Sequence, residues 1–122
     1  MNKYNLSDVI SYHDFGIAFG SFLDVFYRTT DTARYEMISN PPLAKNTSDM
    51  LNVCILAAAV HKLPNDYGLD VPDWVYNSKY TMPYPVYAQN TKKPEYQEFL
   101  RENAPFEYAS RNLYYSNVLE RV

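Results

Sequence analysis

The feature that most constrains the fold is an apolar run in the middle of the chain. Every residue from position 50 to position 60 is apolar except Asn52. Capping side chains stand before the run at positions 46–49 and Leu63-Pro64 stands behind it, which predicts a helix that ends near the proline. A helix that is apolar all round is normally buried on all sides, and this one is too short to span a bilayer. We therefore expect the central helix of the fold here. Three of its side chains are expected in the core: Leu51, Ile55 and Leu56.

The size and composition of the chain fit one globular domain. It has 122 residues, of which 47% are hydrophobic and 20% charged, enough for one hydrophobic core. We expect an all-α protein with a single domain over residues 1–122. In this prediction, residues 1–64 form a small helical bundle around the central helix, and residues 65–122 form a proline- and tyrosine-rich irregular arm and short C-terminal helices packed on it.

Phenylalanines at helical spacing mark the N-terminal region. Phe15, Phe19, Phe22 and Phe26 recur at intervals of four, three and four residues, the pattern of an amphipathic helix. Two interpretations stay open. One is a single helix of about five turns that starts at Ser7-Asp8 and ends near Thr29-Thr30. The other has a break near His13-Asp14, with Asp14 capping a second helix.

A further short helix is expected over residues 31–39. In this prediction Tyr35 and Ile38 face inward. Asn40-Pro41-Pro42 ends the helix, because a residue before proline is pushed out of the α region.

The second half of the chain is rich in proline. Six of the 8 prolines lie from Pro64 onward, and proline favours the first turn of a helix. Short helices are therefore expected to begin at Pro72, Pro94 and Pro105, with a last turn near Ser116-Asn117. Residues 78–93 lack a helical period, so we expect them to lie as an extended arm over the helices.

Few residues of the chain suggest chemistry. It holds one cysteine and two histidines, with no spacing typical of a metal site and no nucleophile-elbow or phosphate-loop motif. Cys54 lies among apolar neighbours, which predicts a buried thiol with a raised pKa. His61 comes at the end of the central helix, where the helix dipole favours a cation. We expect no catalysis, no metal and no cofactor.

The net charge of −3 argues against a nucleic-acid partner, because such proteins carry basic patches. The arginines are scattered, each with acidic residues nearby. No membrane association is expected. The single cysteine and the lack of a signal-peptide pattern predict a cytoplasmic protein.

Aromatic residues provide the candidate binding surface. Rings recur between Trp74 and Tyr87, in a stretch stiffened by Pro72 just before it and by Pro83 and Pro85 within it. Such a segment either covers its own helices or receives a partner. Arg111 follows Glu107 by four residues, and three interpretations stay open: an exposed ion pair, a guanidinium bound to backbone carbonyls, or a polar fork for a partner. The candidate partner-binding residues are Trp74, Tyr76, Tyr80, Tyr84, Tyr108, Arg111, Asn112 and Tyr115.

Three motifs carry a resemblance to a family. They are Phe22-Leu23-Asp24-Val25-Phe26-Tyr27-Arg28, Gly68-Leu69-Asp70-Val71-Pro72-Asp73-Trp74, and a tail from Phe106 to Arg121 that contains Arg111-Asn112 and ends Leu119-Glu120-Arg121. The chain resembles an uncharacterised family of small, mostly helical bacterial proteins. The resemblance implies a link to toxin–antitoxin-type loci and brings no activity with it.

We therefore expect a protein that acts by binding another protein, as the antitoxin-like or regulatory member of a pair. The alternatives are a DNA-binding regulator of helix-turn-helix type, for which no basic recognition helix is found, and a small enzyme of unknown class. The oligomeric state, including a homodimer, stays open.

Overall fold

The computed structural model describes residues 5–43 and 47–119. These residues form a mainly α-helical fold with one pair of two-residue strands, which confirms the predicted fold class. The α-helices are α1 (Leu6–Ser11), α2 (Phe15–Arg28), α3 (Asp31–Ile38), α4 (Met50–Tyr67), α5 (Pro94–Asn103) and α6 (Phe106–Ala109). The 3-10 helices are η1 (Thr47–Asp49), η2 (Asp73–Tyr76), η3 (Ser78–Tyr80) and η4 (Ala88–Asn90), and the strands are β1 (Val86–Tyr87) and β2 (Leu113–Tyr114). No helix in the described ranges is long and apolar enough to cross a membrane.

The N-terminal region is two helices, so the interpretation with a break is confirmed. The Asn5 side chain accepts the backbone N–H of Asp8 at 2.9 Å and caps α1. Asp14 accepts the backbone N–H of Ile17 at 3.1 Å and caps α2. Such caps satisfy amide groups that have no partner inside the helix. The chain between them is extended at Tyr12.

The phenylalanine pattern of α2 is buried most deeply in its second half. Phe22 and Phe26 are fully buried, whereas Phe15 and Phe19 are partly buried at the edge of the same core. Helix α3 follows directly and contributes Met37 and Ile38 to that core.

The prediction that Tyr35 faces inward is wrong, since it is 45% exposed. Arg34 sets the orientation of α3 instead. Its guanidinium donates to the carbonyl of Phe26 at 2.7 Å and to that of Tyr27 at 3.0 Å. These carbonyls lie at the end of α2, where helical partners are missing. With Arg34 turned toward α2, the neighbouring Tyr35 points to solvent.

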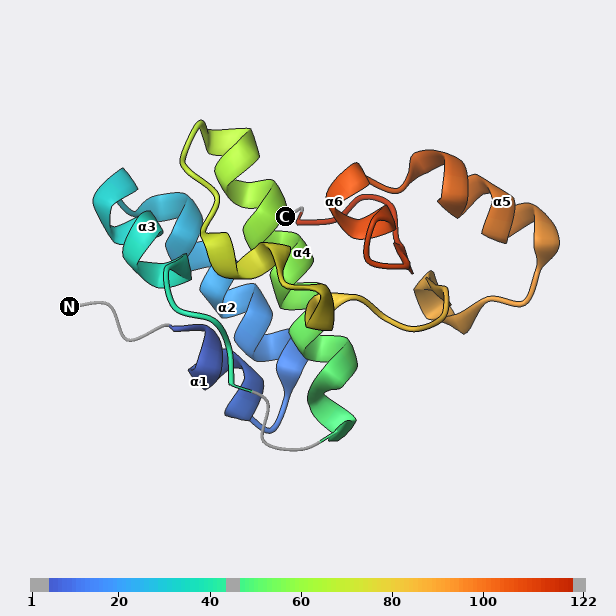
Figure 1. Ribbon diagram of the computed structural model, residues 1–122, viewed down its shortest axis with the longest axis horizontal. Helices are drawn as coiled ribbons and strands as arrows, with labels where there is room; N and C mark the ends of the chain where they lie inside the picture. Colours follow the sequence, from blue (N-terminus) through green and yellow to red (C-terminus); the bar gives the residue numbers. More distant parts are fainter. Residues whose placement is uncertain (1–4, 44–46, 120–122) are drawn as a thin grey trace.

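Helix α4 is the buried central helix, as predicted. It lies between α1, α2 and α3 on one side and α6 on the other (Figure 1). One face contributes Val53, Leu56 and Val60 to the core shared with α1, α2 and α3. Another face contributes Cys54 and Ala58 to a second core that contains Tyr108 and Leu113.

Two expectations for α4 are wrong. Leu51 and Ile55 are only half-buried, because they lie at the edge of the second core. The helix also continues through Pro64 to Tyr67. Pro64 removes the backbone donor that would bond to the carbonyl of Val60 in the preceding turn, yet the helix continues for three more residues. The helix ends at Gly68, whose positive φ of 71° lets the N–H groups of Gly68 and Leu69 reach the carbonyl of Pro64.

The short helices expected after Pro72, Pro94 and Pro105 are confirmed as η2, α5 and α6. The pair of parallel strands, in which Val86 pairs with Leu113, was not predicted. The turn expected at Ser116-Asn117 is not helical, and Asn117 has a positive φ of 53°.

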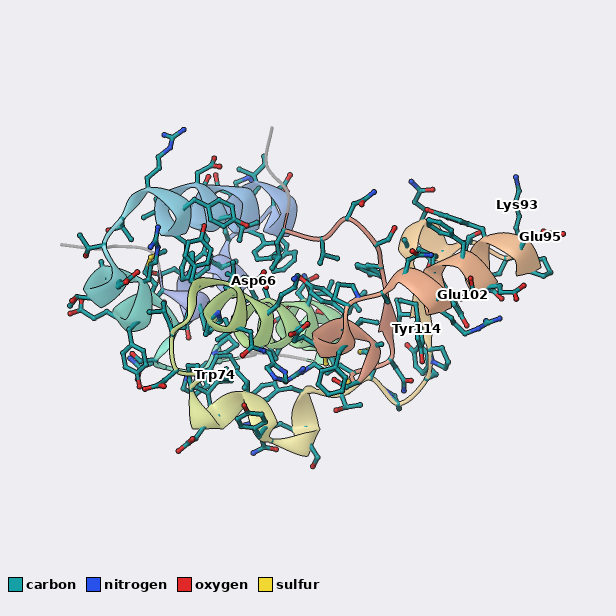
Figure 2. All side chains as sticks on the ribbon, turned by 90° about the horizontal axis from the view of Figure 1, so that it is seen from above. Asp66, Trp74, Lys93, Glu95, Glu102 and Tyr114 are labelled. Atoms are coloured by element: carbon teal, nitrogen blue, oxygen red, sulfur yellow. The ribbon has the colours of Figure 1, made fainter. Side chains whose placement is uncertain are left out.

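The arm expected over residues 78–93 covers the helices only in its first part. Tyr80 and Met82 are buried, and the chain then leaves α4, forms β1 and η4, and leads to α5 at the far end of the molecule (Figure 1). Lys93, just before this outer helix, and Glu95 and Glu102 on it are exposed, whereas Tyr114 lies on its inner side (Figure 2). The prolines at 83 and 85 keep this stretch out of a helix. Its backbone is extended at β1 and pairs with β2.

The central position of α4 predicts the effect of shortening its buried side chains. Leu56→Ala should lower the free energy of unfolding by about 2–5 kcal/mol, because the side chain is fully buried and leaves a cavity. Met50→Ala, in the exposed first turn of the same helix, should change it by less than about 1 kcal/mol. Urea titration of both variants measures the difference. Equal losses would contradict the central position of α4.

Candidate functional site

The candidate site is an open hollow of about 300 Å³ between α4, η2–η3 and α6. Arg111 forms part of its wall, beside His61 from α4 and Val75 from η2. Tyr76 and Phe106 stand at its rim. The lining residues are His61, Val75, Tyr76, Asn77, Ser78, Thr81, Phe106, Ser110 and Arg111.

Among the described residues Arg111 is the one buried cation, with only 5% of its surface exposed. One terminal nitrogen, Nη1, donates to the carbonyl of Glu107 at 2.8 Å and contacts Nδ1 of His61 at 3.1 Å. The other, Nη2, donates to the carbonyl of Val75 at 2.7 Å. The side chain thus joins α4, η2 and α6, which is the arrangement expected of a guanidinium bound to backbone carbonyls.

The chain turns sharply around Arg111. The N–H of Arg111 donates to the carbonyl of Tyr108, and Asn112 has a positive φ of 64°. Asparagine tolerates this conformation better than most residues. The side-chain amide of Asn112 donates to the backbone carbonyl of Met82 at 2.7 Å. The backbone carbonyl of Asn112 accepts the N–H of Val86 at 2.8 Å. The turn therefore fixes the C-terminal segment against the arm.

His61 lies inside α4 and is held as a neutral acceptor, so the expectation of a cation at the end of the helix is wrong. A guanidinium can only donate, so Nδ1 of His61 accepts the hydrogen bond and Nε2 carries the proton. Burial lowers the pKa of His61 below its usual 6.5, and the charge of Arg111 lowers it further, while Glu107 acts in the opposite direction. The ring stands edge-on to Tyr76 and Phe106, with centroid distances of 5.4 and 6.1 Å.

The Glu107 carboxylate points to α4. It accepts a hydrogen bond from the side-chain amide of Asn65 at 3.1 Å. Burial alone would raise the pKa of Glu107, but hydrogen bonds from its own backbone and from Asn65, together with nearby positive charge, hold it below its ordinary value. Arg111 bonds to the carbonyl of Glu107 instead, so these two residues do not form the exposed ion pair that was one of the three interpretations.

The predicted partner-binding residues divide by exposure. Tyr76 and Tyr84 are exposed, at 62% and 59% of their surface, and only Tyr76 lines the hollow. Tyr80, Tyr108 and Arg111 are buried, because the small core is filled with large side chains. Trp74, Asn112 and Tyr115 are half-buried. The Trp74 indole donates to the carbonyl of Ile38 at 2.9 Å and so connects η2 to the end of α3.

Phe106 belongs to the site although the sequence did not single it out. It is 71% exposed at the start of α6, while Tyr108 of the same short helix is buried. Residues two apart in a helix point in nearly opposite directions. Once Tyr108 is placed in the core, Phe106 must face outward.

The thiol of Cys54 is buried in the second core, and burial raises its pKa, as expected of a structural cysteine. The described residues hold no cluster of three or more metal-ligating side chains.

A second, wider groove of about 840 Å³ runs between α3 and residues 69–76. Asp70 and Asp73 stand along it, with Tyr35 and Trp74. The charged residues of this groove are acidic, whereas the hollow contains the cation Arg111 and no acidic residue.

The three bonds of Arg111 predict that lysine cannot replace it. Arg111→Lys should lower the free energy of unfolding by about 1–3 kcal/mol, because one ammonium group cannot serve two buried carbonyls and His61 together. Arg101→Lys is the matched control, since Arg101 is exposed on α5. It should change the free energy by less than about 0.5 kcal/mol. Urea titrations that place both variants at the same stability would contradict this role.

The lowered pKa of His61 predicts a pH dependence of stability. The unfolded chain protonates His61 at a higher pH than the folded protein does. The stabilisation of the folded state by neutral His61 is therefore complete above about pH 6.5 and is lost as the pH falls through the folded pKa. His61→Gln keeps an acceptor but does not titrate. It should flatten the decline in urea midpoint between about pH 7 and pH 5. His13→Gln, in the exposed turn before α2, should leave the decline intact; a decline unaffected by His61→Gln would refute the assignment.

Comparison with known proteins adds no relative. No family model matches the chain, and neither curated proteins nor solved structures match it significantly.

Proposed function

We propose that this chain acts by binding another protein, through a surface formed by Tyr76, His61 and Phe106. One observation carries the proposal. Tyr76 is 62% exposed and Phe106 71% exposed, and the two rings stand against the same histidine beside a hollow. Phe106 is the most exposed large hydrophobic residue in the described part of the chain.

Exposed rings on a rigid support are typical of binding hot spots. An aromatic side chain that leaves water on binding contributes a large apolar area at a small cost in conformational entropy. Phe106 follows Pro105, and the turn after α6 is fixed by Arg111. Tyr76 ends η2, whose Val75 carbonyl is bound by the same guanidinium. Both anchors are thus held in place before a partner arrives, which lowers the cost of association.

The chemistry of the described residues favours binding over catalysis in this proposal. The Cys54 thiol lies inside the core with a raised pKa. His61 uses Nδ1 to accept from Arg111, and no hydroxyl or thiol of the described residues is hydrogen-bonded to it. A general base normally needs a nucleophile within hydrogen-bond reach.

We extend the proposal to an antitoxin-like or regulatory member of a cytoplasmic pair, on the strength of the motif resemblance alone. The helix-turn-helix alternative gains no supporting observation. The α2–α3 pair exposes Asp31 and Glu36, and Arg34 is engaged with the end of α2. A recognition helix normally offers free basic side chains to phosphates and bases.

A comparative pull-down tests the proposal. The tagged wild-type chain should retain a specific protein from its native cell, with the product of a neighbouring gene as the first one to look for. Tyr76→Ala combined with Phe106→Ala should lose that protein, because both exposed anchors are gone. Tyr84→Ala combined with Phe99→Ala is the matched control, since these rings are also exposed but lie outside the hollow.

Thermal melts should show both double variants folded. Identical sets of captured proteins for the wild type and the Tyr76/Phe106 variant would contradict the proposed surface.

A further inference from the structure

We propose that the hollow at Arg111 is a carboxylate pocket that receives the C-terminal residue of a partner protein. The carboxylate would bind the guanidinium of Arg111, and the terminal side chain would lie between Tyr76 and Phe106. The inference rests on the protein-binding function proposed above and deepens it by naming the group that enters the hollow.

The first observation is that Arg111 keeps unused donors. A guanidinium has five N–H groups. Those of Arg111 make three contacts with described residues, two from Nη1 and one from Nη2. The N–H of Nε and the second N–H of Nη2 make none to the described part of the chain. No fully buried side-chain nitrogen or oxygen among these residues lacks a partner, so the unbonded Nε is not fully enclosed by the protein.

The second observation is the charge of the wall. Arg111 is 5% exposed and forms no ion pair with a described residue. Neither Asp nor Glu lines the hollow, and the nearest acidic group in the sequence, Glu107, turns its carboxylate to Asn65. In contrast, Asp70 and Asp73 stand in the groove beside α3. A buried cation without a contacting anion is costly, so a carboxylate at this position gains a strong, charge-assisted bond.

The surroundings favour a chain terminus over other carboxylates. The hollow of about 300 Å³ combines the cation with two aromatic rings and with the polar side chains of Asn77, Ser78 and Ser110. A C-terminal residue brings a carboxylate, an apolar side chain and a peptide group in one unit. Capture of a terminal carboxylate is one of the recurring modes of peptide recognition. An internal Asp or Glu offers a carboxylate but no apolar side chain on the same residue.

The test uses three short peptides on the full chain, at neutral pH. They are acetyl-Ala-Ala-Phe with a free carboxylate, the same peptide with a C-terminal amide, and acetyl-Ala-Glu-Ala with a C-terminal amide. Titrations followed by amide and imidazole NMR signals should show the free carboxylate binding at least about tenfold more tightly than either amide. The shifts should centre on His61 and Ser110.

A pair of surface variants serves as the control for the pocket. Ser110→Asp places a carboxylate at the rim of the hollow and should abolish binding of the free peptide. Asn103→Asp, which adds the same charge on α5 outside the hollow, should keep it. Ser110 and Asn103 are both exposed, so both variants are expected to fold. This pair avoids the destabilisation expected from changing Arg111 itself.

Each outcome decides the question. Equal binding of the free and amidated Phe peptides, or no binding of either, overturns the carboxylate pocket. Tighter binding of the Glu peptide overturns the assignment to a chain terminus. If the peptides fail while the Tyr76/Phe106 variant still loses its partner in the pull-down, the carboxylate inference falls and the protein-binding proposal stands. If that variant loses nothing, the protein-binding proposal falls.

Discussion

The C-terminal third of the molecule depends on one buried guanidinium. Arg111 binds the carbonyls of Val75 and Glu107 and contacts His61, so a single side chain links η2, α6 and α4. Hydrogen bonds to a charged donor are stronger than neutral ones, and buried carbonyls left without a partner are costly. The turn at Asn112 then places β2 beside β1. These segments are short, and none of them could bury a core of its own.

The same interaction prepares the exposed surface. Because Arg111 holds the residues beside Tyr76 and Phe106, the two rings stand at fixed positions, each edge-on to His61. Helix α4, which carries His61, is itself held in place, since one of its faces packs on α1 and α2 and another on Tyr108 and Leu113. A rigid support of this kind lets apolar side chains remain in water until a partner covers them. Arg111 thus both fastens the C-terminal segments and positions the rings of the proposed binding surface.

Local signals in the sequence predict where most of the α-helices lie, but not all of their ends and not the contacts between distant segments. The apolar run at 50–60 and the prolines at 72, 94 and 105 predicted four helices, because burial and the fixed φ of proline act locally. The end of α4 is predicted at Pro64 but lies at Tyr67, because the helix continues through the proline and ends only at Gly68 with its positive φ. The strands depend on a pairing between residues far apart in the chain, and no local pattern of two residues predicts that.

The candidate site shows the same division. Tyr76 and Arg111 were chosen for their chemistry, and the structure brings both to one hollow. Tyr80 and Tyr108 are equally aromatic but fill the core, because the choice between core and surface depends on which face of a short helix meets α4. Phe106 was overlooked for the same reason. The bond from Arg111 to the carbonyl of Val75 spans 36 residues and has no signature in the sequence.

Native-state hydrogen exchange of the Arg111→Gln variant tests most directly whether this guanidinium fastens the C-terminal third. Glutamine is polar but cannot span the two carbonyls. Met82 and Val86 donate to the carbonyls of Arg111 and Asn112 across this region, and Asn112 donates to Ala109 within the turn. If Arg111 fastens the segment, these three amides lose protection, while those in the middle of α2 keep it. Equal loss of protection in α2 and at these three amides, or unchanged protection at all of them, would contradict that role.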